Sequence, residues 1–296
     1  MSKDISFTVT GATGFIGQAL CAELSRQGFF VKAYGRSAEF SARPGIQYTC
    51  VNSYFEVVGS PSSVCIHLAG ENSLAAAENQ TGNPLTDAVQ LSEHICDQRF
   101  ASVVCASSAA VYGDRAMSPH RENGSVNCLG AYAQLKHAVE EVVLRRRQIV
   151  ARIANVYGPG MSKKNVFSDI LGQLGTSGPV RMKCLFPVRD FIHVTDLTRG
   201  LICLAVGKEP GVFNLGTGFG ASIADIANRI LDITGQRDRG ICCIGSSHSH
   251  SCIILDCSKI KQSYGWGAQV ELRQGLKELV HSAREGAAGQ CLSDRV

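Results

Sequence analysis

The segment Gly11-Ala12-Thr13-Gly14-Phe15-Ile16-Gly17 follows an alternating apolar stretch, Ile5 to Val9, and runs into a helical pattern that continues through Leu24. In this order of strand, loop and helix, glycines allow a tight turn and let the backbone approach a pyrophosphate. The N–H groups that open the following helix favour negative charge. The alternative is a purely structural turn. We expect a Rossmann-type domain whose dinucleotide contacts are Gly11, Thr13, Gly14, Phe15, Ile16 and Gly17.

Short apolar strands alternate with helical patterns through the first half of the chain, which predicts an α/β fold with a doubly wound parallel sheet. The expected strands are Ile5–Val9, Phe29–Tyr34, Val64–Leu68, Val103–Ala106, Ile149–Ile153 and, later, Val212–Leu215. Beyond Tyr157 glycines and prolines interrupt the pattern, so we expect a smaller, interleaved carboxy-terminal substrate lobe.

The expected division gives residues 1–155 plus about 188–215 to the dinucleotide-binding domain, and about 156–187 plus 216–296 to the substrate-binding lobe. Helices are expected at 222–234 and at Leu272–Ala283. The polar tail from Glu285 onward is expected to be frayed.

Composition excludes several functions. Of the 296 residues 45% are apolar, and the net charge is only +4, without the dense basic blocks of a nucleic-acid surface. The run Arg145–Arg147 stands where a helix is expected to end, and cations there complement the helix dipole. We expect no secretory signal before the first strand, and no apolar run is long enough to span a membrane.

Thirteen cysteines are scattered through apolar segments without a Cys-x-x-Cys pair, so we expect reduced thiols and a cytoplasmic protein. A carboxy-terminal group of potential ligands lacks the regular spacing of a metal site, which predicts a loop and no metal. This group comprises Cys242, Cys243, His248, His250, Cys252 and Cys257.

The residues after the second expected strand bear on the choice of dinucleotide. An acidic residue about 20 positions beyond the glycine loop commonly hydrogen-bonds the adenosine 2′-hydroxyl. This chain has Gly35-Arg36-Ser37 there. A guanidinium and a hydroxyl suit a 2′-phosphate, so NADP is the preferred cofactor and Arg36 its contact. In the alternative, Arg36 stacks on the adenine and the cofactor is NAD.

Tyr132 and Lys136 are four residues apart in the helical pattern Ala131–Arg146, so both project from one face. This helix follows the strand at 103–106, whose carboxyl end faces the cofactor cleft. A neighbouring ammonium and an oxidised nicotinamide would stabilise the phenolate. We expect Tyr132 to exchange a proton with substrate and Lys136 to tune and orient it. Ser108, at the end of the same strand, could bind the reacting oxygen or merely cap backbone.

Together these residues resemble the extended short-chain dehydrogenase/reductase superfamily, in its sugar-nucleotide epimerase, dehydratase and reductase branch. The resemblance spans nearly the whole chain and includes 67–70 (HLAG), 107–113 (SSAAVYG), 152–160 (RIANVYGPG), 189–194 (RDFIHV) and 213–216 (FNLG). It implies a nucleotide-sugar substrate and a homodimer formed through Rossmann helices, including the Tyr132 helix.

The resemblance also implies roles for individual residues. Ser108 would be the third catalytic member and would contact substrate. Leu68, Ala69 and Gly70 would line the cofactor together with Tyr132 and Lys136. Asn155 would touch the sugar nucleotide, and Arg189 would meet its phosphates or ribose; an ion pair of Arg189 with Asp190 or Asp196 is the alternative.

Departures from the family narrow the reaction. The 4,6-dehydratases usually carry an Asp-Glu pair where this chain has Ala109-Ala110, and the epimerases usually hold NAD and carry an acid where it has Arg36. Residues 246–251 lack the second phosphate-binding arginine of many relatives. The leading hypothesis is reduction of a 4-keto-sugar nucleotide with Tyr132 as proton donor. The alternatives are a nucleotide-sugar 4-epimerase with tightly bound NAD and a non-catalytic dinucleotide-sensing protein.

Overall fold

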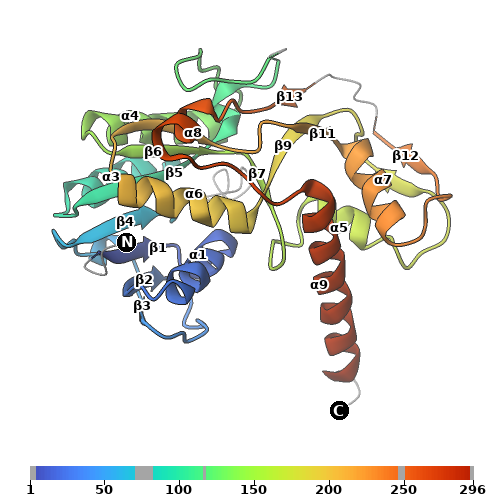
Figure 1. The fold of residues 1–296 in the computed structure, drawn as a ribbon, viewed down its shortest axis with the longest axis horizontal. Coiled ribbons are helices and arrows are strands. Elements are labelled where there is room, and N and C mark those ends of the chain that lie inside the picture. The colour runs from blue at the N-terminus through green and yellow to red at the C-terminus, as the bar shows by residue number, and fades with distance from the viewer. Residues whose placement is uncertain (1–4, 71–82, 116–117, 246–250, 294–296) are drawn as a thin grey trace.

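A seven-stranded parallel sheet, in the order β10-β6-β5-β4-β1-β2-β3, forms the centre of the molecule (Figure 1). The computed structural model describes residues 5–70, 83–115, 118–245 and 251–293, with side chains through 285. The strands are β1 Ser6–Thr10, β2 Val31–Gly35, β3 Ile46–Cys50, β4 Ser63–His67, β5 Ser102–Ser108, β6 Ile149–Ile153 and β10 Gly211–Leu215. Because β1 lies between β2 and β4, the direction in which the sheet grows reverses there, and ligands of such sheets bind at the carboxyl ends beside this point.

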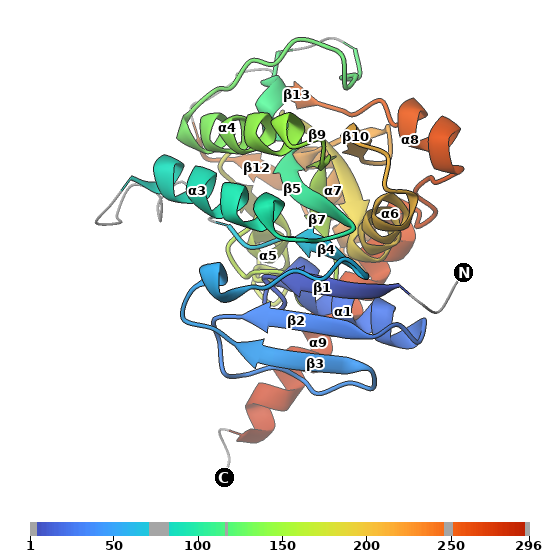
Figure 2. The same ribbon diagram turned by 90° about the vertical axis from the view of Figure 1, so that its left-hand side faces the viewer.

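Helices cover both faces of the sheet (Figure 2). On one face lie α1 (Phe15–Arg26) and α6 (Val194–Gly207), and on the other α3 (Pro84–Asp97) and α4 (Ala131–Arg145). Each helix turns an apolar stripe to the sheet; α1, for example, buries Gly17, Leu20, Cys21 and Leu24 at helical spacing. The predicted doubly wound α/β fold is therefore confirmed.

Two smaller sheets and three helices form the other end of the molecule (Figure 1). The four-stranded sheet contains β7 Asn155–Tyr157, β9 Val188–His193, β11 Gly220–Ser222 and β13 Cys252–Ile253, and the two-stranded sheet pairs β8 Val180–Met182 with β12 Ile241–Cys243. The helices are α5 Val166–Leu171, α7 Ile223–Ile233 and α9 Leu272–Ser293. They share a core of their own that includes Tyr157, Phe167, Phe191, Ile226 and Leu276.

The six predicted strands are present with ends shifted by two residues at most, and so is the Tyr132 helix. Two expectations are wrong. The loop expected around the carboxy-terminal cysteines contains β12 with Cys242 and Cys243, and β13 with Cys252, because these residues pair with β8 and β9. The tail expected to fray from Glu285 continues α9 to Ser293.

Some expectations concern residues that the structure does not describe, or features that it does not test. His248 and His250 lie outside the described residues, and elsewhere in the described ranges no three His, Cys, Asp or Glu side chains are grouped for a metal. None of the helices in the described part of the chain is both long and apolar enough to cross a membrane. The division of the chain into two domains stays a prediction.

Candidate functional site

The glycine loop brings the backbone of β1, α1 and the end of β4 into close contact. Gly11 has φ 72°, and a Cβ there would lie 2.9 Å from the backbone nitrogen of Ala69. A Cβ on Gly17 would overlap the carbonyl oxygen of Gly11. Gly14 stands at the N-cap of α1, with no side chain satisfying the first N–H groups of that helix. These glycines leave backbone donors available to an anion, as the sequence predicts.

A cavity of about 600 Å³ opens beside this loop. It is lined by Gly11, Thr13, Gly14, Arg36, Ser37, Tyr54, Leu68, Ala69 and Gly70. Seven of these residues were predicted to bind the cofactor, and the sheet brings them together from the ends of three strands, β1, β2 and β4. The predicted contacts Phe15, Ile16 and Gly17 lie on α1 outside this lining. Tyr54, on the short 3-10 helix η1 (Tyr54–Glu56), was missed.

Lys136, on α4, lies close to one end of this cavity. Its ammonium nitrogen is buried, donates to the carbonyl oxygen of Ala106 at 3.4 Å, and lies 5.8 Å from the ring centre of Tyr132. A Cβ on Gly70 would lie 3.7 Å from the same nitrogen. The ammonium therefore stands between the half-buried phenol of Tyr132 and the Gly70 end of the cofactor cavity.

Ser108 is the last residue of β5 and the N-cap of η2 (Ala109–Tyr112). Its hydroxyl accepts a hydrogen bond from the backbone N–H of Ala110 at 3.2 Å. This is the backbone-capping role that the sequence offered as the alternative to a catalytic role. A serine hydroxyl that accepts one hydrogen bond keeps its proton as a donor. Capping therefore fixes the Ser108 side chain and is compatible with donation to a substrate oxygen.

A buried polar network holds α4 against the ends of β5 and β6. The Glu140 carboxylate, one turn beyond Lys136, binds Arg152 through two nitrogens, at 3.0 and 2.6 Å, and accepts from the Ser107 hydroxyl. The Arg152 guanidinium lies 4.6 Å from the ring centre of Tyr112, whose hydroxyl donates to Asn214 at 2.8 Å. None of these residues was predicted individually, although all but Glu140 fall within motifs of the resemblance. The network fixes the helix that carries Tyr132 and Lys136.

His67 is a buried imidazole at the end of β4 that sequence reasoning left without a role. Burial lowers the pKa of His67 to about 3, and the charge of Lys136 adds to this effect, so the ring is neutral at physiological pH. Its Nδ1 lies 2.7 Å from the Thr10 hydroxyl oxygen, which also accepts from the backbone N–H of Ala69 at 3.3 Å. His67 and Thr10 thereby hold the turn that lines the cofactor cavity.

A second cavity, of about 740 Å³, is lined by two of the three predicted substrate contacts, Asn155 and Arg189, but not by Ser108. Lys163, Lys164 and Lys183 line it as well, and Asp169 is the only acidic residue among its lining residues. The three lysines were missed because they come from separate irregular segments. An excess of cations beside an amide suits a phosphorylated ligand.

Arg189 is held by backbone and serine oxygens. It donates to the carbonyl oxygens of Val188 and Ser251 and, at 2.6 Å, to the Ser251 hydroxyl. Asp196 pairs instead with Arg199, and the Asp190 carboxylate accepts from Thr217, Gly218 and Leu255, so neither carboxylate has Arg189 as its partner. Burial lowers the pKa of Arg189, although the nearby Asp114 opposes this. The guanidinium charge is therefore available for an anionic ligand in the cavity.

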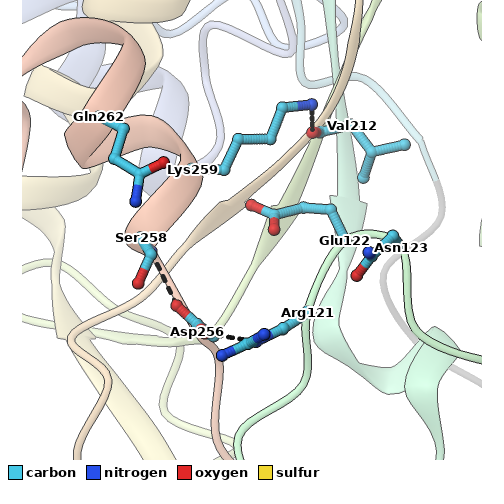
Figure 3. Close-up of a pocket in the computed structure, with 8 residues that line it drawn as sticks. All are labelled: Arg121, Glu122, Asn123, Val212, Asp256, Ser258, Lys259 and Gln262. Carbon is cyan, nitrogen blue, oxygen red and sulfur yellow. Dashed lines mark hydrogen bonds and ion pairs between the residues drawn. The ribbon is translucent and has the colours of Figure 1, made fainter.

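A third cavity, of about 580 Å³, lies between the loop at 121–123, β10 and the short helix α8 (Ser258–Tyr264) (Figure 3). Within it Arg121 pairs with Asp256 at 2.9 Å, and Lys259 donates to the carbonyl oxygen of Val212 at 2.7 Å. It contains none of the predicted catalytic or cofactor residues, so the candidate site is formed by the other two cavities.

The chain is similar in sequence and in fold to several known proteins. A putative UDP-glucose 4-epimerase of Methanocaldococcus jannaschii is 26% identical over 74% of this chain and 76% of its own length. The dTDP-6-deoxy-L-talose 4-dehydrogenase (NAD(P)(+)) of Kitasatospora kifunensis is 24% identical over 92% of this chain and 93% of its own. Among solved structures, MoeE5 in complex with UDP-glucuronic acid and NAD superposes with a TM-score of 0.81 at 26% identity, covering 95% of this chain and 99% of MoeE5.

The family model of the NAD-dependent epimerases and dehydratases matches residues 7–216, which run from β1 to the end of the central sheet and include the glycine loop, Ser108, Tyr132 and Lys136. This match covers more than half of the chain. By its sequence and its fold, the chain belongs to the NAD-dependent epimerase/dehydratase family.

Proposed function

We propose that this protein is an NADP(H)-dependent reductase of a nucleotide-linked 4-keto sugar. The observation that carries the proposal is the position of Lys136, whose ammonium stands between Tyr132 and the Gly70 end of the cofactor cavity. The cavity fits a dinucleotide because glycines admit no Cβ at the loop and leave backbone donors for phosphate. A bound nicotinamide would supply the hydride.

Three side chains of this chain would carry out the proton transfer to the substrate oxygen. Tyr132 would donate its phenolic proton to the oxygen that gains charge as the keto group is reduced, and Ser108 would hydrogen-bond the same oxygen. The Lys136 ammonium would stabilise the resulting phenolate. Ala109 and Ala110 follow Ser108, so no carboxylate stands at these two positions. A base that could abstract a proton for elimination is therefore absent there, which disfavours a dehydratase.

The substrate cavity supports a nucleotide diphosphate as the carrier of the sugar. Arg189 and three lysines would neutralise the phosphates, while Asn155 would hydrogen-bond the sugar or nucleotide. MoeE5 is bound to UDP-glucuronic acid and NAD in its structure, and the Kitasatospora relative is named as a 4-dehydrogenase using NAD(P)(+). The first supports a nucleotide sugar as ligand, and the second supports chemistry at the sugar 4-position.

A 4-epimerase is the second candidate, favoured by the archaeal relative's name. The two reactions differ in their use of hydride, since a reductase consumes NADPH with each turnover and an epimerase regenerates its bound cofactor. We would release the dinucleotide that copurifies with the protein and then follow NADPH absorbance with keto-sugar nucleotides. Stoichiometric oxidation of NADPH supports the reductase, whereas tightly retained NAD+ and interconversion of sugar epimers contradict it.

Arg36→Asp is expected to reverse the preference for NADPH over NADH. Arg36 lines the cofactor cavity, and a carboxylate there would repel a 2′-phosphate and accept a hydrogen bond from a 2′-hydroxyl. A charge-assisted contact is worth about 1.5–3 kcal/mol, so the ratio of the two dissociation constants should change by at least about tenfold. Fluorescence titration with both cofactors measures the ratio, and an unchanged ratio would mean that Arg36 does not meet the 2′-phosphate.

Removing two cations from the substrate cavity, with Lys163→Ala/Lys164→Ala, is expected to raise the KM for nucleotide sugar by about tenfold while kcat stays near the parent value. Both lysines are exposed and line the cavity with Arg189, away from Tyr132. The difference in KM between the variant and the parent should become smaller at higher salt concentration, because salt screens the charges. Lys261→Ala, on α8, is the matched control. Equal KM values for the double variant and this control would remove the lysines from the substrate site.

The homodimer also remains a proposal. Leu85 on α3 and Leu144 on α4 are exposed apolar side chains, and the two helices pack side by side (Figure 2). Covering such residues in a second copy would bury apolar surface, which is the driving force expected for an interface through the Tyr132 helix.

A further inference from the structure

Tyr48 belongs to the edge strand β3, which lies beside β2 (Figure 2), and its side chain reaches the loop that follows β2. Its hydroxyl donates a hydrogen bond to the backbone carbonyl oxygen of Ser37, which lines the cofactor cavity. A Cβ on Gly35 would lie 2.8 Å from the Tyr48 hydroxyl oxygen and 2.7 Å from the methyl carbon of Thr13, another lining residue. The Tyr48 hydroxyl therefore lies directly behind the cavity, although Tyr48 is not part of the lining.

The ring of Tyr48 is held by packing. It stacks on the ring of Phe40, with the two ring centres 4.4 Å apart and the planes 5° from parallel. Both rings pack against the buried core of the central sheet. Phe40 follows the loop that begins after Gly35, the last residue of β2. The loop at 36–39 is thus fixed at both ends and, through the carbonyl of Ser37, in its middle.

The Ser37 hydroxyl is also oriented within this loop. It accepts a hydrogen bond from the backbone N–H of Glu39 at 3.2 Å. A serine hydroxyl that accepts one hydrogen bond keeps its own proton for another acceptor. Burial raises the pKa of Tyr48, so the phenol is protonated at physiological pH and acts as the donor to the Ser37 carbonyl. Ser37 therefore offers the cavity a hydroxyl donor whose backbone and side chain are both held in place.

We propose that Tyr48 is a positioning residue for cofactor specificity, which holds the Ser37 hydroxyl where it donates to the 2′-phosphate of the dinucleotide. This inference rests on the proposed use of NADPH and deepens it, because it gives the phosphate a second contact besides Arg36. A hydroxyl binds a phosphate oxygen strongly, since the hydrogen bond is charge-assisted. The neutral 2′-hydroxyl of NADH gains less from the same donor, so a fixed Ser37 favours the phosphorylated cofactor.

The test uses Tyr48→Phe, which keeps the ring that stacks on Phe40 and removes only the hydroxyl. The probes are adenosine 2′,5′-bisphosphate and adenosine 5′-monophosphate, which differ by the 2′-phosphate, titrated into the full chain by calorimetry. Tyr48→Phe should weaken the bisphosphate by about three- to tenfold more than the monophosphate, because Ser37 loses its fixed position. An equal loss for both probes, or no loss for either, would overturn the inference.

Tyr34→Phe is the matched control. Tyr34 stands on the neighbouring strand β2, packs against a different buried cluster, which includes Val57 and Ile95, and lies outside the cavity lining. Removal of its hydroxyl should leave the ratio of the two affinities unchanged. A ratio that falls equally in both variants would show general damage to this edge of the sheet and would contradict positioning by Tyr48.

A double-mutant cycle tests whether Tyr48 acts through Ser37. Ser37→Ala alone should reduce the preference for the bisphosphate by about tenfold, because a charge-assisted hydrogen bond is lost. In the Ser37→Ala background, Tyr48→Phe should no longer change the ratio of the two affinities, because the hydroxyl that it positions is gone. A further fall of the ratio in that background would mean that Tyr48 acts through another group, and the inference would be wrong.

The same measurements distinguish failure of the inference from failure of the proposed cofactor. If Arg36→Asp reverses the cofactor preference while Tyr48→Phe leaves the ratio of affinities unchanged, only the role of Tyr48 is wrong. If the parent protein binds the bisphosphate no better than the monophosphate, the proposed NADP(H) dependence is wrong and the role of Tyr48 fails with it.

Discussion

Tyr132→Phe is expected to lower kcat by about 10²- to 10⁴-fold, the usual contribution of a positioned proton donor. Tyr132 lies in the first turn of α4, and the Lys136 ammonium nitrogen lies 5.8 Å from the centre of its ring. Phenylalanine keeps this ring, so that folding and NADPH affinity should stay close to the parent values. Single-turnover oxidation of NADPH with a keto-sugar nucleotide measures the loss, and cofactor titration shows that the site still fills.

Tyr264→Phe provides the control for that experiment. Tyr264 carries a phenol on α8, where its hydroxyl accepts from the backbone N–H of Glu209, away from both cavities of the site. It should keep the parent turnover. If Tyr132→Phe behaves like this control, the proton comes from another group, and the assignment of Tyr132 as proton donor has to be abandoned.

Glu140→Ala is expected to lower the free energy of unfolding by about 3–5 kcal/mol, the usual cost of removing one partner of a buried ion pair. The Arg152 side chain is only 4% exposed and would lose the carboxylate that binds it. Although burial opposes the charged form, Glu140 holds the pKa of Arg152 above its ordinary value. The pKa of an arginine is also too high for the side chain to escape by losing its proton, so the charge would remain buried and uncompensated.

Urea unfolding followed by circular dichroism measures this change. Glu141→Ala is the matched control, because Glu141 is the next residue of α4 and its side chain is exposed, so it should change stability by less than about 0.5 kcal/mol. A similar small change for Glu140→Ala would show that the buried network does not hold α4 in place.

The sheet was predictable because its signals are local. Each of the six predicted strands is a short run of apolar residues, and the glycine loop stands directly between a strand and a helix. The strand β3 was missed because Ile46–Cys50 lies at the edge of the sheet, where only one neighbour covers it and none of its side chains is buried. The helix α6 was missed although it is strongly apolar, and only its first residue, Val194, falls within a motif of the resemblance.

The site was predictable where function depends on residues close in sequence. Tyr132 and Lys136 share one helix, and Arg36 follows a strand at a known distance from the glycine loop. Tyr54 and the lysines of the substrate cavity carry no such local signal. A tyrosine beside a capping box and lysines in irregular segments are common surface features, and only the tertiary fold brings them to a cavity.

The polar network behind α4 has a consequence for how the chain reaches its native state. Tyr112 and its partner Asn214 are separated by 102 positions in the sequence. The Glu122 carboxylate accepts a hydrogen bond from the backbone N–H of Asn214, which is 92 positions away. During synthesis, the first half of the chain leaves the ribosome before the β10 segment that supplies these partners exists. Contacts between such distant segments form late, because a long loop must close first. The helix α4, which carries Tyr132 and Lys136, therefore gains its full support only when β10 completes the edge of the sheet, and enzymatic activity would report the end of folding.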